Sequence, residues 1–151
     1  CFDSVSVCLS KGLGTPTGSV LCGSRALIRR ALRIRKMAGG GMRQAGILAA
    51  AGIHALDHHV DRMAQDHALA QKLARGLQGV AGVQVESPDT NIVFVDLVDG
   101  VRERADALIP FLKTHGVLAS GLYRLRFVTH LDVDAVGVQR AIDAMAAFCA
   151  N

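Results

Sequence analysis

The chain has 151 residues, half of them hydrophobic, and its formal net charge is +4. This length allows one domain or parts of two, and the apolar content is ample for a core. No apolar run approaches the roughly 20 residues that a helix needs to cross a membrane, and the opening residues lack the basic and apolar regions of a secretory signal. We therefore expect neither a membrane-spanning nor a secreted protein.

The charge is distributed unevenly along the chain. Between Ser4 and Leu56 there is no Asp or Glu, whereas the same stretch holds eight basic residues. The remaining residues are slightly acidic in total. Segregation of this kind indicates that the basic part faces something anionic.

The four cysteines form neither a C-x-x-C pair nor a zinc-binding spacing. Cys8 and Cys22 lie within apolar runs, where cysteine usually serves as a small buried hydrophobic residue. This usage favours a reducing, cytoplasmic location.

The apolar pattern predicts two strands joined by a glycine-rich turn. Ser4–Leu9 is expected to be a buried strand, and Ser19–Cys22 a second, short strand. The glycines between them permit positive φ and a close approach of the backbone to a ligand. Lys11 stands where the first strand gives way to this turn.

Lys11 is the first candidate catalytic residue. The pKa of a lysine falls readily on burial or beside other cations, and a neutral amine is a nucleophile that can form a Schiff base. The basic, acid-free surroundings favour that role. A solvated loop lysine is the alternative, because most charged side chains are simply exposed.

Three helices are predicted next. Ser24 is a good N-cap for a helix that runs to Met37 and ends at the triglycine Gly39–Gly41. A very apolar helix is expected over Gln44–Leu56, and a long amphipathic helix over Asp57–Leu77.

The triglycine and the following Arg43 suggest an anion site. The glycine N–H groups can face an anion, and Arg43 can add a bidentate fork. The many arginines of the preceding helix also raise nucleic acid as a ligand, but aromatic residues are nearly absent there and no known nucleic-acid module is present. A solvated face or a subunit interface is the alternative for that helix.

Four histidines, His54, His58, His59 and His67, occur close together. His54 and His58 have the i, i+4 spacing of helical metal ligands, but there is no H-E-x-x-H motif and no evident third ligand. We therefore predict a solvated helix face and no metal site.

A change of composition near residues 79–88 indicates a boundary, which divides the chain into residues 1–78 and 79–151. The second part has the alternation typical of a small α/β domain. Its predicted elements are strands at Val83–Val85, Asn91–Leu97, Val117–Leu118 and Leu122–Val128 and helices at Glu103–His115 and Val133–Phe148.

Arg126 interrupts the last apolar strand, on the face opposite Tyr123, Leu125 and Phe127. An arginine there can bind a carboxylate of the protein or of a substrate. A structural ion pair is the default, because buried arginines are normally paired. Arg124 has the same strand parity, so the pattern alone does not separate the two arginines.

Taken together, these segments resemble the low-specificity L-threonine aldolases. The similar runs are Ser10–Pro16, Gly18–Ser19, Arg35–Met37, Gly39–Gln44, Gly46–Gly52, Asp89–Asn91 and Arg126–Val133. They extend over essentially the whole chain, and the lysine loop combined with the Gly-Gly-Gly-Met-Arg run is specific. The resemblance implies an α/β fold: the end of the large domain of a pyridoxal 5'-phosphate (PLP)-dependent transferase of the aspartate aminotransferase type, followed by a small C-terminal α/β domain.

The resemblance also implies roles for individual residues. Lys11 would hold PLP through a Schiff base. Arg43, together with Lys36, would reach the phosphate group of the PLP bound to a neighbouring subunit, in a dimer or tetramer. Arg126 would hold the carboxylate of an amino-acid substrate. The implied reaction is retro-aldol cleavage of L-threonine or L-allo-threonine to glycine and acetaldehyde, with no nucleic-acid or membrane partner.

Several parts of the family pattern are missing from these residues. The phosphate-cradling turn, the ring-stacking aromatic residue, the aspartate facing the pyridine nitrogen and the proposed basic histidines would all precede Cys1. We therefore expect a piece of a longer protein that is inactive by itself. The alternatives are another PLP-dependent β-eliminating or carbon–carbon lyase of the same fold, a non-catalytic fragment, and an anion-binding module.

Overall fold

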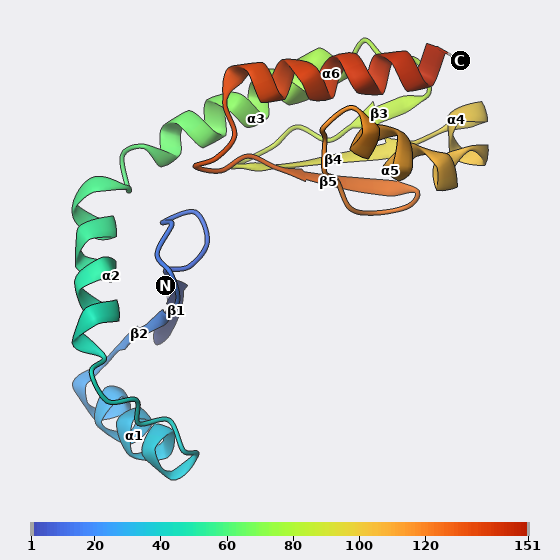
Figure 1. The fold of residues 1–151 in the computed structure, drawn as a ribbon. Helices are drawn as coiled ribbons and strands as arrows, with labels where there is room; N and C mark the ends of the chain where they lie inside the picture. Colours follow the sequence, from blue (N-terminus) through green and yellow to red (C-terminus); the bar gives the residue numbers. More distant parts are fainter. Residues whose placement is uncertain (1, 151) are drawn as a thin grey trace. The chain divides into compact units, whose positions relative to one another are not determined.

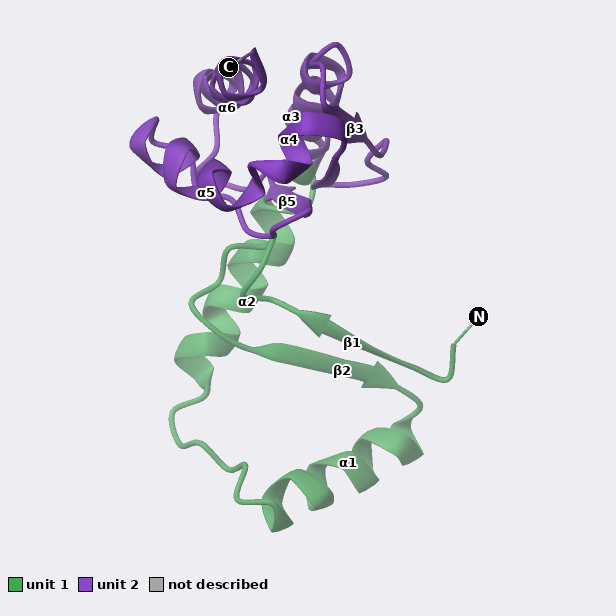
Figure 2. Cartoon of the chain, turned by 90° about the vertical axis from the view of Figure 1, so that its right-hand side faces the viewer, with its two compact units in different colours: residues 1–63 green, residues 64–151 purple. Residues whose placement is uncertain are grey.

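The computed structural model describes residues 2–150. The chain forms two compact units that divide between Met63 and Ala64. Figure 2 colours the first unit green and the second purple. Each unit is described by itself.

The first unit begins with an antiparallel pair of strands, β1 (Ser4–Cys8) and β2 (Ser19–Gly23), in which Cys8 lies opposite Ser19. The predicted positions of both strands are confirmed. The prediction that they are buried is wrong for the described structure, because almost all of their side chains are exposed. The physical reason is that a two-stranded sheet has two faces to cover, and the small apolar cluster of this unit lies beyond the end of β1 and not over either face.

Helix α1 (Arg25–Met37) starts as predicted, because the Ser24 hydroxyl oxygen accepts a hydrogen bond from the Leu27 N–H (3.2 Å). The helix contains no buried residue. It ends in a Schellman turn, with Gly39 at φ +83° and the Gly40 N–H donating to the Arg35 carbonyl oxygen (2.8 Å).

The expected long helix over residues 57–77 is not observed. Helix α2 (Gly46–His58) instead continues through His58, and helix α3 (Met63–Leu77) begins after a turn at residues 59–62. The break separates two packing partners, because α2 buries Gly52 and Ala55 in the first unit, whereas α3 contributes to the core of the second.

The second unit is a three-stranded antiparallel sheet with helices packed on one face (Figure 1). The strands are β3 (Val83–Val85), β4 (Ile92–Leu97) and β5 (Arg124–Val128), with β4 in the centre. The helices are α3, α4 (Asp99–Glu103), α5 (Ala105–Thr114) and α6 (Ala135–Ala150).

Alternation along the strands decides which face of this sheet is buried. Val93, Val95 and Leu97 of β4 and Leu125 and Phe127 of β5 all point into the core among the helices. The residues between them, which include both arginines of β5, lie on the opposite face. Arg126 therefore lies on the more exposed side of the sheet, as the pattern predicts.

The helix expected over residues 103–115 is confirmed as α5, and a short helix that was not predicted, α4, precedes it. One further prediction in this unit is wrong. Residues 117–118 form no strand, because the Val117 N–H donates back to the Leu112 carbonyl oxygen (2.9 Å) at the end of α5. Gly116, at φ +72°, ends that helix as predicted.

The observed division at Met63 differs from the compositional boundary near residue 79. Helix α3 belongs with the second unit because Leu73 and Leu77 are buried in its core and Gly76 lies against Ile142 of α6. The buried Thr129 hydroxyl also donates to the Asp66 carbonyl oxygen of α3 (2.6 Å).

No helix within residues 2–150 combines the length and the apolar character needed to cross a bilayer.

Candidate active site

The loop between β1 and β2 presents Lys11 at the surface. Leu9 and Leu13 are buried on either side of the exposed Lys11. The loop is closed by its own backbone: the Leu9 N–H donates to Gly18 O (3.0 Å), and the Gly14 N–H donates to Lys11 O (2.8 Å). Gly14 and Gly18 have φ values of +69° and +116°, which glycine adopts without strain.

Helix α2 packs against this loop. Leu9 and Leu13 form a small apolar cluster with Ala55, and Met63 packs against it. Gly52 allows close packing here, because a Cβ at this position would lie 3.0 Å from the Leu9 Cδ1 atom. The loop that carries Lys11 is therefore seated on α2.

His59, just past the end of α2, contacts the same loop. Its Nδ1 atom lies 2.7 Å from the Leu13 carbonyl oxygen. The prediction of a solvated face fits the exposed His54 and His58 but is wrong for the half-buried His59 and His67. No sequence signal marks this contact, because its partner lies 46 residues away.

The triglycine does not offer its N–H groups to an anion. Gly39, Gly40 and Gly41 donate instead to Lys36 O (3.2 Å), Arg35 O (2.8 Å) and Gly39 O (3.1 Å). The predicted anion-facing N–H groups are therefore a misinterpretation. The last carbonyl groups of α1 need donors, and the chain that follows the helix supplies them.

Lys36 lies directly against this turn. A Cβ at Gly41 would stand 2.8 Å from the Lys36 Nζ atom, so the absence of a side chain at Gly41 leaves the room that the ammonium group occupies. Arg43 follows in an exposed turn in which Gln44 has φ +54°. Within residues 2–150, the side chains of Lys11, Lys36 and Arg43 form no hydrogen bond or ion pair.

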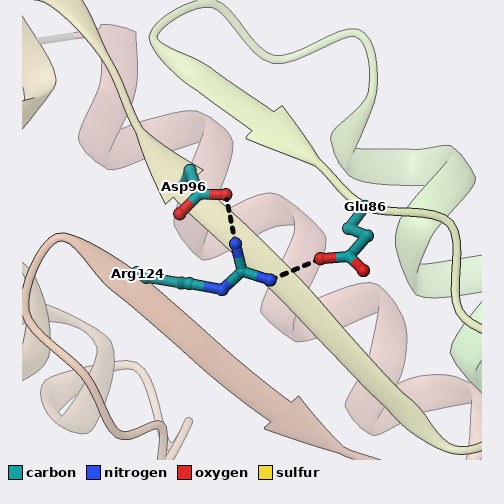
Figure 3. Close-up of polar contacts among 3 residues, drawn as sticks. All are labelled: Glu86, Asp96 and Arg124. Carbon is teal, nitrogen blue, oxygen red and sulfur yellow. Dashed lines mark hydrogen bonds and ion pairs between the residues drawn. The ribbon is translucent and has the colours of Figure 1, made fainter.

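The two arginines of β5 have different partners. Arg124 forms ion pairs with Glu86 and, at 3.0 Å, with Asp96 (Figure 3). Its guanidinium also lies over the Phe94 ring. Arg126 lies opposite Phe94 in the register and forms no ion pair with any described residue. The structural pairing expected by default at Arg126 belongs to Arg124.

A tight loop borders Arg126 on the free edge of β5. The Arg126 N–H donates to the Ser120 carbonyl oxygen (2.9 Å). Gly121 follows at φ +120°, and a Cβ there would overlap the Arg124 carbonyl oxygen. The loop thus fixes the backbone from which the Arg126 side chain extends.

The Cys8 thiol lies three residues before Lys11. The Ser10 hydroxyl, 3.5 Å from the Cys8 Sγ atom, lowers the pKa of this thiol; burial acts in the opposite direction, and the positive charge of Lys11 adds a smaller lowering effect. Burial raises the pKa of the Cys149 thiol.

Of the predicted site residues, Lys11, Lys36 and Arg43 belong to the first unit and Arg126 to the second. The first unit thus contains the candidate groups for PLP, and the second contains the candidate group for a substrate carboxylate.

Comparison with known proteins gives matches over most of the chain. The family model described as "Beta-eliminating lyase" matches residues 1–99. A low specificity L-threonine aldolase of Escherichia coli (strain K12) is 52% identical over 131 residues, which are 87% of this chain and 38% of that protein. The chain thus spans well under half the length of this relative.

Solved structures share the fold. A putative L-allo-threonine aldolase from Listeria monocytogenes EGD-E has a TM-score of 0.75 at 19% identity, covering 97% of this chain and 45% of that chain. The aminotransferase TlmJ from Streptoalloteichus hindustanus has a TM-score of 0.74 at 19% identity, covering 98% of this chain and 52% of that chain. The predicted fold type is confirmed. The match over residues 1–99 shows that the chain belongs to the beta-eliminating lyase family, in which it is similar to low-specificity L-threonine aldolases.

Proposed function

We propose that these residues are part of a PLP-dependent lyase that cleaves L-threonine and L-allo-threonine to glycine and acetaldehyde. The observation that carries the proposal is the 52% identity, over 131 residues, to a protein named low specificity L-threonine aldolase. The placement of the candidate side chains supports it.

The residues of the first unit suit PLP. Lys36 and Arg43 are cations without protein partners among the described residues, and Lys36 lies over a glycine turn where a Cβ would fill the space. Two such cations suit a phosphate dianion, which takes a point charge from lysine and a bidentate fork from arginine. The exposed Lys11 amine, held on a closed loop, suits covalent attachment to an aldehyde.

When bound, PLP supplies an electron sink for the electron pair left behind as the Cα–Cβ bond of the amino acid breaks. The chain itself supplies attachment at the Lys11 Nζ atom, phosphate binding at Lys36 and Arg43, and orientation of the substrate by Arg126. A guanidinium that binds the substrate carboxylate orients the substrate and thereby selects which bond of Cα is positioned for cleavage. Orientation of this kind can lower the activation free energy of the reaction by roughly several kcal/mol.

Product analysis of the complete enzyme tests the proposal. Given L-threonine or L-allo-threonine, it is expected to release acetaldehyde and glycine in equal amounts, and Lys11→Ala is expected to reduce this release to background. Acetaldehyde release by Lys11→Ala at the parental rate would remove Lys11 from the mechanism.

One other reaction is favoured by a specific observation, since the matching family model is described as a beta-eliminating lyase. β-Elimination from serine or an aromatic amino acid yields pyruvate and ammonia instead of an aldehyde and glycine. Pyruvate and ammonia as the main products, with no acetaldehyde from threonine, would favour this second function. A non-catalytic role predicts neither product and no PLP uptake.

We also propose that the enzyme is a cytoplasmic homo-oligomer, a dimer or a tetramer, with sites shared between subunits. The exposed basic and apolar side chains of α1, a helix with no buried residue, support an interface there. The free thiols of Cys8, Cys22 and Cys149 support a reducing compartment. Light scattering of the complete enzyme is expected to give a mass of two or four chains, and a monomer would contradict the shared site.

A further inference from the structure

The contact of His59 with the lysine loop is the feature that the proposed roles leave unused. Its Nδ1 atom lies 2.7 Å from the Leu13 carbonyl oxygen, across 46 positions of sequence. A carbonyl oxygen can only accept a hydrogen bond, so the Nδ1 atom carries the hydrogen. The contact therefore fixes both the tautomer of His59 and the position of one peptide group in the loop.

That peptide group lies two residues after Lys11. The turn between them is closed by the Gly14 N–H, which donates to the Lys11 carbonyl oxygen (2.8 Å). Gly12 and Gly14 otherwise give this turn wide conformational freedom, which costs entropy to restrict. A donor anchored on helix α2 restricts it from outside the loop.

The apolar contacts of the loop do not orient the Leu13 peptide group, whereas the hydrogen bond from His59 does. Leu9, Leu13 and Ala55 are buried and hold the loop against α2, but apolar packing is non-directional and does not set the orientation of a peptide group. The His59 side chain forms a hydrogen bond to the Leu13 peptide group from the segment that follows α2. The imidazole thus adds a directional restraint to the loop's own backbone hydrogen bonds.

A metal site does not account for this contact. The His54 ring lies 4.5 Å from the His58 ring and 5.4 Å from the His59 ring, centroid to centroid. The His59 Nδ1 atom is already used on the carbonyl group, and no set of three metal-ligating side chains is placed together within residues 2–150.

We propose that His59 is a positioning residue for Lys11: its Nδ1–H holds the Leu13 peptide group, and thereby holds the loop in the form that presents the Lys11 amine for attachment to PLP. This inference rests on the proposed function. It deepens that function by assigning a role to a residue that acts through the loop carrying Lys11.

Three variants of the complete enzyme test the inference. His59→Ala removes the donor. His59→Asn keeps it, because the amide nitrogen of asparagine stands where Nδ1 stands, one bond from Cγ. His58→Ala is the matched control, since this neighbouring histidine is exposed and its side chain forms no hydrogen bond to the described residues of the loop.

The first readout is amide hydrogen exchange at Gly14 and Thr15 in the cofactor-free enzyme. Loss of one hydrogen bond is expected to speed exchange about tenfold in His59→Ala. Exchange in His59→Asn should stay near the parental rate, and in His58→Ala it should not change. The core amides of β4 and β5 report whether each variant is folded.

The second readout is the rate at which Lys11 is attached to added PLP, trapped with borohydride and measured by peptide mass. This rate is expected to fall about tenfold in His59→Ala and to recover in His59→Asn, in proportion to the lost hydrogen bond. Equal rates in all variants, or a loss in His59→Asn as large as in His59→Ala, would overturn the positioning role.

The two readouts separate this inference from the proposed function. If the parental enzyme attaches no PLP at Lys11, the proposed function fails, and with it the role of His59 in attachment. If Lys11 is labelled normally but His59→Ala exchanges its loop amides at the parental rate, the inference fails and the proposed function stands.

Discussion

Arg126 has the properties of a binding arginine, and its neighbour Arg124 has those of a structural one. The register of β4 and β5 decides this difference, because it places Asp96 opposite Arg124 and Phe94 opposite Arg126. Arg124 forms ion pairs with the carboxylates of Asp96 and Glu86. The guanidinium of Arg126 forms no ion pair with a described residue. A cation on the open face of a sheet, without a protein partner, is available to a ligand.

Substitution of the two arginines should separate these roles. Arg126→Ala in the complete enzyme is expected to lower kcat/KM for threonine by about 10- to 100-fold, since hydrogen bonds to charged groups contribute about 1.5–3 kcal/mol. Arg124→Ala removes half-exposed ion pairs and the contact of the guanidinium with the Phe94 ring, and it should change the free energy of unfolding by at most about 2 kcal/mol. Equal kinetic effects of the two substitutions would contradict the assignment.

The thiols of Cys8 and Cys149 should differ in reactivity. The hydroxyl of Ser10 lowers the pKa of Cys8, so a larger fraction of Cys8 is thiolate near neutral pH, whereas burial raises the pKa of Cys149 and reduces its thiolate fraction. Alkylation of the 151-residue chain with iodoacetamide, followed by peptide mass, is expected to modify Cys8 before Cys149, and Ser10→Ala should slow the modification of Cys8. Faster alkylation of Cys149 would refute the ordering.

Among the elements, the connections between helices and strands determine where the candidate site residues stand. The tight loop at Gly121 brings the Ser120 carbonyl group to the Arg126 N–H. The Schellman turn after α1 brings the Lys36 ammonium group against Gly41. Both loops depend on glycine at positive φ, so their geometry is sensitive to single substitutions.

Two glycine substitutions should therefore have opposite effects on stability. Gly121→Ala forces a Cβ onto a residue at φ +120° and against the Arg124 carbonyl oxygen, and it is expected to cost about 1–3 kcal/mol. Gly100→Ala, inside α4 with open space around it, should instead stabilise by about 0.5–1 kcal/mol. Urea unfolding measures both, and a neutral Gly121→Ala would show that the loop relaxes.

Local patterns predicted the elements well, and long-range contacts explain the failures. Both strands of the first unit, the Ser24 cap and the buried face of β5 follow from neighbouring residues. The break between α2 and α3 does not, because each helix takes its packing partner from a different unit.

The same limit applies to the candidate site. Strand parity places Arg124 and Arg126 on one face but gives no register, so it does not show which of them is paired. The contact of His59 is with Leu13, which is far away in sequence. The N–H groups of the triglycine donate to the last carbonyl groups of α1, and the glycine motif alone does not show this. The roles of Lys11, Lys36, Arg43 and Arg126 remain predictions.

At the scale of the whole chain, the two units differ in how much core they have. The second unit buries apolar side chains from all four of its helices and from β4 and β5. Among the described residues of the first unit, the buried hydrophobic side chains are Leu9, Leu13 and Ala55, while large apolar residues such as Ile47 and Met37 are 74% and 78% exposed. Exposed apolar surface on this scale marks an interface, and the relatives are more than twice as long as the chain that matches them.

This difference predicts independent folding of one unit only. Residues 64–151 alone are expected to unfold cooperatively in urea, since their core is complete. Residues 1–63 alone are expected to show no cooperative transition and to bind a hydrophobic dye, because little apolar area is buried. A cooperative transition in residues 1–63 would show that the first unit does not need a partner surface.

Peptide mapping decides whether Lys11 is the attachment point of PLP, as we propose. The complete enzyme is incubated with PLP, reduced with borohydride and digested, and the modified peptide is identified by mass. We predict a single modified lysine at Lys11, with Lys36 unmodified. Stable modification at another lysine, or none at all in an enzyme that still cleaves threonine, would contradict the account.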